Sequence, residues 1–176
     1  AAKLQAGEKM SGSARVLIDI ILAVYESLSV NTLRLMRELS QHKRDDEFLR
    51  KLLLAVEQSP SSIVITDLAA NIEFVNAAFL KSTGYSRDET IGRNPRILQS
   101  GKTPATTYRA MWDMLAQGRI WQGEFINKRK DGSEYIERAL ISPVQQADGA
   151  VTHYLAVKDD ITERKRVEKA LRDSHQ

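Results

Sequence analysis

The sequence predicts an α+β protein with one antiparallel sheet, short helices on one face of the sheet, and helical segments before and after it. The first observation is a change of hydrophobic period, from helical before Ser59 to strand-like after Ser62. The second is the order of elements: two strands, several short helices, then a three-strand meander. Short turns join the first two strands and the three strands of the meander, so we expect one five-stranded antiparallel sheet with helices on one face.

Composition and charge narrow the class of protein. The chain has 176 residues, of which 42% are hydrophobic, enough for one domain of ordinary size plus additional helix. The net charge is only +3, and no basic face with interleaved aromatic residues is visible, so we expect no nucleic-acid partner. The chain contains no cysteine, which excludes disulfides, thiol catalysis and Cys-ligated metal sites.

Few residues suggest catalysis or metal binding. His42, His153 and His175 are far apart and lack the spacing of metal ligands, so we predict no metal site. The acidic residues are scattered and no nucleophile–base pair is suggested, so we predict no enzyme activity and no catalytic residue.

The N-terminal region is predicted to be a linker at 1–13 and a helical dimerisation region at 14–58. Leu17, Ile21, Leu28 and Leu35 recur at helical spacing, and the charged stretch 41–47 interrupts the pattern. So wide an apolar face needs a partner, either a second copy of the chain or the domain that follows.

The same helix contains the most apolar run of the chain, Val16–Val30. Asp19 and Glu26 interrupt it, so we predict no membrane span. No small-residue cleavage site follows the run, and with no signal peptide we expect a cytoplasmic location.

The domain at 59–161 starts where Pro60 stops the helix. Segments 62–67 and 72–76 form a strand hairpin, and a short helix at 77–83 is closed by Gly84. Ser86 begins another helical turn, and Thr103 is predicted to cap a helix that has Pro104 in its first turn.

Three long strands complete the domain. Segments 120–130 and 133–145 flank Asp131–Gly132, a strong hairpin signal, and 150–160 is the third strand. Asp159 and Asp160 are placed to cap the start of a C-terminal signalling helix at 162–176.

One strand face could hold a flat heteroaromatic ring. Alternation places Trp121, Gly123, Phe125 and Asn127 on one face, where the aromatic rings supply contact area and the Asn127 amide can donate and accept hydrogen bonds. The alternative is an ordinary core in which Asn127 caps a backbone group.

The loop "GRNPRILQSGKTP" at 92–104 leaves two possibilities open. Arg93, Arg96 and Lys102 could meet a pyrophosphate, or the loop could be a rigid connection with solvated charges. Its "GKT" string is not a P-loop, because the spacing of its glycines is wrong and no strand leads into it.

The segments "AVEQSPSSIVITDLAANIEFVNAAFLKSTGYSRDETIG", "GRNPRILQSGKTP", "MWDMLAQGRIWQGEFINKRKDGSEY" and "VKDDITERK" together resemble a PAS sensory domain (PAS/PAC) over about 53–166. The resemblance implies a regulatory module rather than an enzyme. It implies a homodimer formed through flanking helices and an effector domain C-terminal to the module, such as a histidine kinase, a cyclic-di-nucleotide enzyme or a chemoreceptor.

Within that family, "GRNPRILQ" resembles the flavin-binding photoreceptors, whose motif has Cys where Pro95 stands here. That Cys forms the light-driven flavin adduct, so adduct photochemistry is impossible in a chain without a thiol. Photoreceptors also have a flavin-contacting Gln where Lys158 stands.

The chain also resembles the flavin redox sensors of nitrogen-fixation and methane-oxidation regulation, which bind FAD without a thiol. The resemblance implies that Thr103, Trp112 and Asn127 contact the flavin. Val64 and Pro95 replace polar contact residues of the nitrogen-fixation sensor.

We therefore predict a flavin-based redox sensor with FAD as its cofactor, FMN or no cofactor being the alternatives. Lys158 is expected near the reactive edge of the ring, favouring its anionic reduced form. The rival class is a cofactor-free PAS dimerisation or interaction module of a histidine kinase or diguanylate cyclase. The predicted cofactor-binding residues are Thr103, Trp112, Asn127, Arg96, Lys158 and Phe125.

Overall fold

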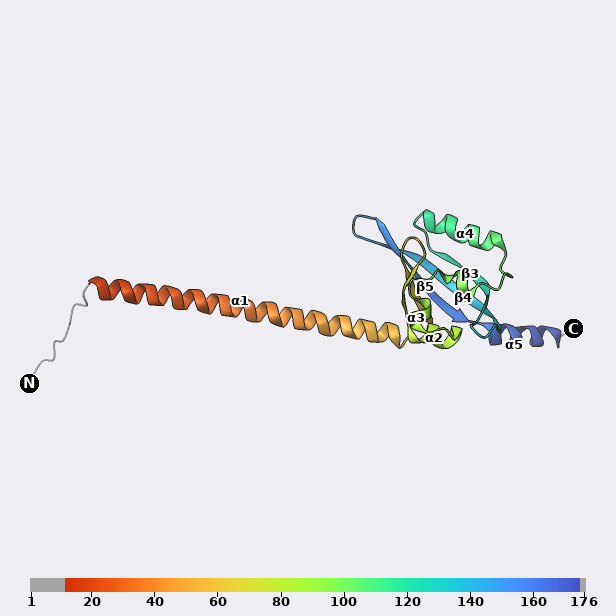
Figure 1. Cartoon of the computed structure of the whole chain (residues 1–176), viewed down its shortest axis with the longest axis horizontal. Coiled ribbons are helices and arrows are strands. Elements are labelled where there is room, and N and C mark those ends of the chain that lie inside the picture. Colours follow the sequence, from red (N-terminus) through yellow and green to blue (C-terminus); the bar gives the residue numbers. More distant parts are fainter. Residues whose placement is uncertain (1–11, 175–176) are drawn as a thin grey trace, which may run out of the picture. The chain divides into compact units, whose positions relative to one another are not determined.

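The computed structural model describes residues 12–174, which divide into two units between Lys51 and Leu52. The predicted linker lies outside the described residues except for Gly12 and Ser13, which already belong to the first helix. Figure 1 shows the elements along the chain.

Helix α1 (Gly12–Glu57) runs through both units without a break. The interruption of the apolar pattern at 41–47 does not interrupt the helix, because that stretch contains neither Gly nor Pro and a side-chain hydrogen bond joins successive turns. Gln41 Nε2 donates to Asp45 Oδ1 at 2.9 Å, one turn later. The charged stretch therefore changes the surface of the helix and leaves its backbone helical.

The apolar side chains of α1 in the first unit are exposed, as with Leu28 at 60% and Leu39 at 69%. The helix is long and apolar enough to cross a membrane by length and composition, with a mean hydropathy of 1.6 in its best window. The prediction that it does not span a membrane stays a prediction.

The second unit contains the predicted five-stranded antiparallel sheet, in the order β2-β1-β5-β4-β3. β5 lies in the middle because it pairs with β1 on one side and β4 on the other. The two hairpins are thereby joined into one surface. The strands are β1 (Ser62–Thr66), β2 (Ile72–Val75), β3 (Trp121–Lys128), β4 (Glu134–Gln145) and β5 (Val151–Asp160).

The short helices end and begin where local signals predicted. Gly84, with φ of 78°, closes the first of them in the left-handed conformation that glycine adopts without strain. Ser86 and Glu89 form a reciprocal capping box at the start of the next. The helices of the second unit are α2 (Ala77–Thr83), α3 (Arg87–Thr90), the 3-10 helix η1 (Pro95–Leu98), α4 (Ala105–Ala116) and α5 (Thr162–Asp173).

Thr103 does not cap α4, and that prediction is wrong. Its hydroxyl accepts a hydrogen bond from the Ile126 N–H at 2.8 Å and donates to the Ile126 carbonyl at 3.3 Å, while Pro104 occupies the cap position without a side-chain bond. The competing partner is β3, an edge strand whose backbone groups need partners on that side. Thr103 therefore fastens the loop to the sheet.

Of the two aspartates predicted to cap α5, only Asp160 does so. Asp160 Oδ1 accepts from the Thr162 N–H at 2.9 Å, as expected of a residue that organises the start of the helix. Asp159 instead accepts from the Ser61 hydroxyl at 2.6 Å and from Arg138 at 3.0 Å, so it ties β5 to its neighbours.

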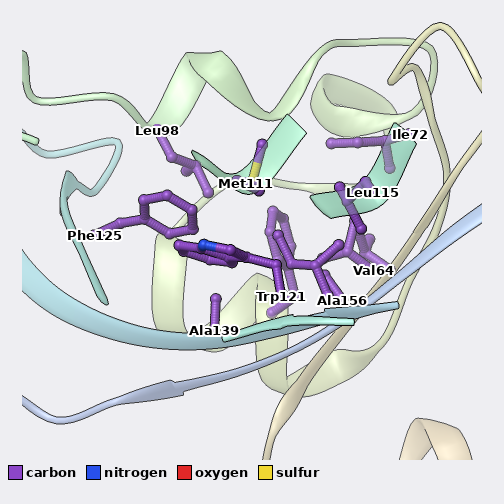
Figure 2. Close-up of a cluster of buried hydrophobic side chains, with 12 residues drawn as sticks. Val64, Ile72, Leu98, Met111, Leu115, Trp121, Phe125, Ala139 and Ala156 are labelled. Atoms are coloured by element: carbon purple, nitrogen blue, oxygen red, sulfur yellow. The ribbon is translucent and has the colours of Figure 1, made fainter. Parts of the chain in front are cut away.

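The core lies between the inner face of the sheet and the helices. The predicted face of β3 is confirmed, because Trp121, Phe125 and Asn127 are buried while Gln122 and Glu124 are exposed. Figure 2 shows the Trp121 ring beside that of Phe125, and their centroids are 5.0 Å apart. The indole also lies across Gly123, where an added Cβ would come within 2.3 Å of the ring.

Candidate functional site

A partly open cavity of about 140 Å³ lies among α4, the loop that contains η1, and the inner face of the sheet. This volume is similar to the ~150 Å³ apolar cavity that admits a benzene ring. One part of the wall is apolar, formed by Val64, Met111, Leu115, Ile141 and Ala156 among others. The polar residues of the wall are Thr66, Asn94, Arg96, Gln99, Asn127 and Lys158.

Aromatic rings form much of the remaining wall. Tyr108 of α4 stacks on Phe125 of β3, with centroids 5.4 Å apart and planes 14° from parallel. Trp112 meets Tyr154 of β5 edge-on at 5.7 Å. Trp112 lines the cavity and is nevertheless 42% exposed, so its indole lies between the cavity and solvent. Planar walls of this kind favour a planar guest.

The polar end of the cavity contains a buried ion pair. Lys158 Nζ lies 3.0 Å from Glu137 Oε2, and the two side chains are only 7% and 3% exposed. The Asn127 amide donates to the same carboxylate oxygen at 2.9 Å. Among the described residues, no buried side-chain nitrogen or oxygen lacks a hydrogen-bond partner, so this polar group is satisfied as it stands.

Tyr135 belongs to the same network. Its hydroxyl lies 3.4 Å from Glu137 Oε1. Burial, followed by the nearby Glu137 carboxylate, raises the pKa of the Tyr135 phenol above its ordinary value. Tyr135 therefore stays protonated at physiological pH and serves as a hydrogen-bond donor to the carboxylate.

Five of the six sequence-predicted site residues line the cavity. Trp112, Phe125, Asn127, Lys158 and Arg96 are brought together there from four separate segments of the chain. Their roles as flavin contacts remain predictions.

The sixth, Thr103, is not among the lining residues, because its hydroxyl is engaged with the backbone of β3. The two positions that depart from the nitrogen-fixation sensor, Val64 and Pro95, both line the cavity.

The three basic residues of the 92–104 loop are not gathered at one point. Arg96 lines the cavity, whereas Arg93 and Lys102 do not. Lys102 instead pairs with Glu134 at 2.7 Å on the surface. Of the three, Arg96 is therefore the one placed to meet a group that extends from the cavity.

Sequence reasoning missed Glu137. A signal was present, because alternation along β4 puts Tyr135, Glu137 and Ala139 on one face, and an acid on a buried face requires a partner. That partner, Lys158, lies 21 residues further along the chain, and only the pairing of β4 with β5 brings the two together.

The part of the chain that the structure describes contains no candidate metal site, since no three His, Cys, Asp or Glu residues there are grouped to hold an ion. His153 pairs with Glu73 at 3.1 Å, and His175 lies outside the described residues.

This fold and pocket define the class of protein. The model of the PAS domain family matches residues 60–163, and the chain belongs to that family of sensory modules. Among curated proteins it is 42% identical over 118 residues to a nitrogen fixation regulatory protein of Klebsiella oxytoca, covering 67% of this chain and 24% of that protein. It is 33% identical over 142 residues to Protein TWIN LOV 1 of Arabidopsis thaliana, covering 76% of this chain and 36% of that one.

Solved structures of light-oxygen-voltage proteins have the same fold as this chain. An RNA-binding light-oxygen-voltage receptor superposes with a TM-score of 0.64 at 30% identity, covering 70% of this chain and 36% of that one. The LOV domain of a blue-light activated histidine kinase from Erythrobacter litoralis gives 0.56 at 27% identity, covering 60% of this chain and 99% of that one. The chain spans about a quarter of the nitrogen fixation regulatory proteins it matches, so it corresponds to one module of such proteins.

Proposed function

We propose that this chain is the sensory PAS module of a larger cytoplasmic signalling protein, and that it holds a flavin, FAD, as a redox sensor. The observation that carries the proposal is the cavity, whose wall combines aromatic and apolar side chains with the amides of Asn94, Gln99 and Asn127 and with Lys158, which pairs with Glu137 behind it. A flavin ring system needs both kinds of surface, because it has an apolar benzenoid end and a polar pyrimidine end that donates and accepts hydrogen bonds.

A flavin needs more space than the cavity now offers. A cavity of about 140 Å³ accommodates a single ring, and three fused rings need more space. A flavin would therefore extend through the wall beside the half-exposed Trp112, or Tyr108 would leave its stack on Phe125. Arg96, exposed at the cavity wall, favours a flavin nucleotide over riboflavin, because its guanidinium can pair with the pyrophosphate of FAD or the phosphate of FMN.

When bound, a flavin supplies an electron-transfer centre whose polar edge changes charge on reduction. Asn127 and Lys158 are placed to orient that edge. A cysteinyl adduct cannot form because the chain has no thiol, so we assign redox sensing rather than the adduct chemistry of light sensors.

The test is the absorption spectrum of the purified chain, before and after addition of FAD. We expect bound flavin that withstands gel filtration, and mass spectrometry of the heat-released ligand then distinguishes FAD from FMN. A folded, colourless preparation that takes up no added FAD contradicts the proposal. That result favours a cofactor-free interaction module, a candidate supported by the rings of Tyr108 and Phe125 that already fill part of the interior.

The output of the module is proposed to leave through α5. Lys158 lies two residues before Asp160 on β5, and Asp160 accepts a hydrogen bond from the first residue of α5. A shift of β5 at the cavity is thereby passed to the helix that leads toward an effector C-terminal to this module. The chain itself senses, and any enzyme activity belongs to that effector.

Dimerisation is proposed to run through α1 with a second copy of the chain. The exposed side chains form a heptad seam that is apolar at most of its positions, with Thr32, His42 and Asp46 as polar layers that fix the register at some cost in stability. The seam consists of Ile18, Ile21, Tyr25, Leu28, Thr32, Leu35, Leu39, His42, Asp46, Leu49 and Leu53.

Charges beside the seam support a parallel, in-register pair. At the flanking positions of successive heptads, Glu38 of one copy meets Lys43 of the other, and Asp45 meets Arg50. Both pairs join opposite charges and occur twice in a symmetric dimer. An antiparallel pair would lose this matching.

Sedimentation of the full chain tests the seam. Glu38→Lys is expected to weaken the dimer about tenfold by bringing like charges together, and the double variant Glu38→Lys/Lys43→Glu to restore it. Glu26→Lys makes the same charge change away from the seam and should have little effect. A monomeric wild type, or a chain that assembles only when inserted into lipid vesicles, contradicts the proposal.

A further inference from the structure

Lys158 and Glu137 are charged side chains buried side by side, which needs a physical account. An isolated buried charge is strongly unfavourable, so each of these groups depends on the other, 3.0 Å away. Lys158 Nζ also lies 6.0 Å from the centre of the Phe125 ring, which borders the cavity. The pair thus stands at the wall of the proposed flavin site.

Glu137 holds two cavity-lining groups without lining the cavity itself. Its Oε2 accepts from Lys158 Nζ and from the Asn127 amide at 2.9 Å, and its Oε1 meets the Tyr135 hydroxyl at 3.4 Å. Asn127 and Lys158 line the cavity, whereas Glu137 lies behind them. The carboxylate therefore fixes the positions of two side chains that a ligand would meet.

The sheet register explains this geometry. Phe125 lies directly opposite Glu137, and Ala139 lies directly opposite Lys158. Asn127, Glu137 and Lys158 are therefore diagonal neighbours on one face of three adjacent strands, a separation that long side chains span. The small side chain of Ala139 leaves room for the ammonium to reach the carboxylate.

We propose that Glu137 is the positioning residue of this site: it neutralises Lys158 and holds Asn127, so that the Lys158–Glu137 pair presents no net charge to the cavity. The inference rests on the proposed function. It revises the sequence-based picture of Lys158 as a lone cation that favours an anionic reduced ring. With the pair intact, the site discriminates little between charged and uncharged forms of the ring edge.

Replacing Glu137 alone and replacing Lys158 alone should then change the relative affinity for reduced and oxidised FAD in opposite directions. Glu137→Gln leaves the Lys158 ammonium unopposed, so the negative charge gained on reduction is stabilised and the ratio of affinities for reduced and oxidised FAD rises by about tenfold or more. Lys158→Met leaves the carboxylate unopposed, and the same ratio falls. In the double variant Glu137→Gln/Lys158→Met the charge is balanced again, and the ratio returns to within about threefold of wild type.

The experiment is a reductive titration of the FAD-loaded chain against a reference dye, for wild type, both single variants and the double variant. A tenfold change in the ratio corresponds to about 30 mV for a two-electron couple. Asp113→Asn, an exposed carboxylate-to-amide change on α4, is the matched control and should leave the potential unchanged. Opposite shifts in the single variants are the signature, because a merely structural role would move both the same way.

The inference is overturned if the potentials of the two single variants shift in the same direction or do not change. It is also overturned if both variants lose affinity for oxidised and reduced FAD equally. If the wild type binds no FAD, the proposed function fails, and thermal unfolding of the same variants still decides the inference. Each single variant should then unfold at a lower temperature, or fail to fold, while the double variant recovers most of the loss. Additive losses, or a double variant that does not fold, overturn it.

Discussion

Replacing Asn76 by Ala should destabilise the PAS unit more than any single surface change, because this fully buried amide joins three elements. Its Oδ1 accepts from the backbone N–H groups of Ile63 at 2.9 Å and Phe79 at 3.2 Å. Its Nδ2 donates to the carbonyls of Val56 and Ser61, both at 3.0 Å. The last turn of α1, strand β1 and the start of α2 therefore share one side chain.

The magnitude follows from the groups left without partners. Loss of the helix cap costs about 1 kcal/mol. The N–H of Ile63 and the carbonyls of Val56 and Ser61 then lose a partner in or beside the core, at about 1–3 kcal/mol for each buried group that water does not reach. These costs overlap, and we expect a total loss of about 3–5 kcal/mol in the free energy of unfolding.

The assay is urea unfolding followed by the fluorescence of Trp121 and Trp112, both in the second unit, since α1 would dominate a circular-dichroism signal. Asn94→Ala is the control, because Asn94 Oδ1 caps the single turn η1 and accepts from the backbone N–H and the Nε of Arg96, an exposed residue, so its loss should cost only about 1 kcal/mol. A loss for Asn76→Ala no larger than that of the control would refute the reasoning. It would mean that water or a backbone shift satisfies the released groups.

Three further outcomes are expected. Gly123→Ala should lower the free energy of unfolding by about 1–3 kcal/mol and alter Trp121 fluorescence, because the new Cβ would come within 2.3 Å of the indole. The ion pair with Lys130 and the capping box lower the pKa of Glu89 to about 2, so Glu89 contributes stability above pH 4.5 that is lost as pH falls toward 2. Glu89→Gln should reduce the acid sensitivity of the unfolding midpoint in that window. Pro95→Cys should restore light-driven bleaching of bound flavin, since that residue lines the cavity.

Each of these has a contrary result. An unchanged Trp121 spectrum in Gly123→Ala would mean that the indole does not lie across the glycine. An acid-unfolding curve for Glu89→Gln that parallels wild type between pH 4.5 and 2 would remove the assigned role of the pair with Lys130. Flavin-loaded Pro95→Cys that shows no bleaching would place the ring away from η1.

Local chemistry in the sequence determined the elements of this protein. Alternation defined the strands, Gly84 and the Ser86–Glu89 box set helix boundaries, and Asp131–Gly132 set a hairpin. These signals act between residues a few positions apart, so they need no knowledge of the rest of the fold. The same local reasoning placed Trp121, Phe125 and Asn127 on one buried face. Most of the residues that the family resemblance implied as flavin contacts also line the cavity.

Tertiary structure decided what depends on distant partners. The central place of β5 brings Lys158 to Glu137, and the edge position of β3 takes the Thr103 hydroxyl away from the helix it was expected to cap. A buried charge or a strand edge selects whichever partner the fold brings within reach, and spacing along the chain does not reveal that partner. Five of the residues that line the cavity were therefore predicted from the sequence, while the pairing of Lys158 with Glu137 was set by the pairing of strands.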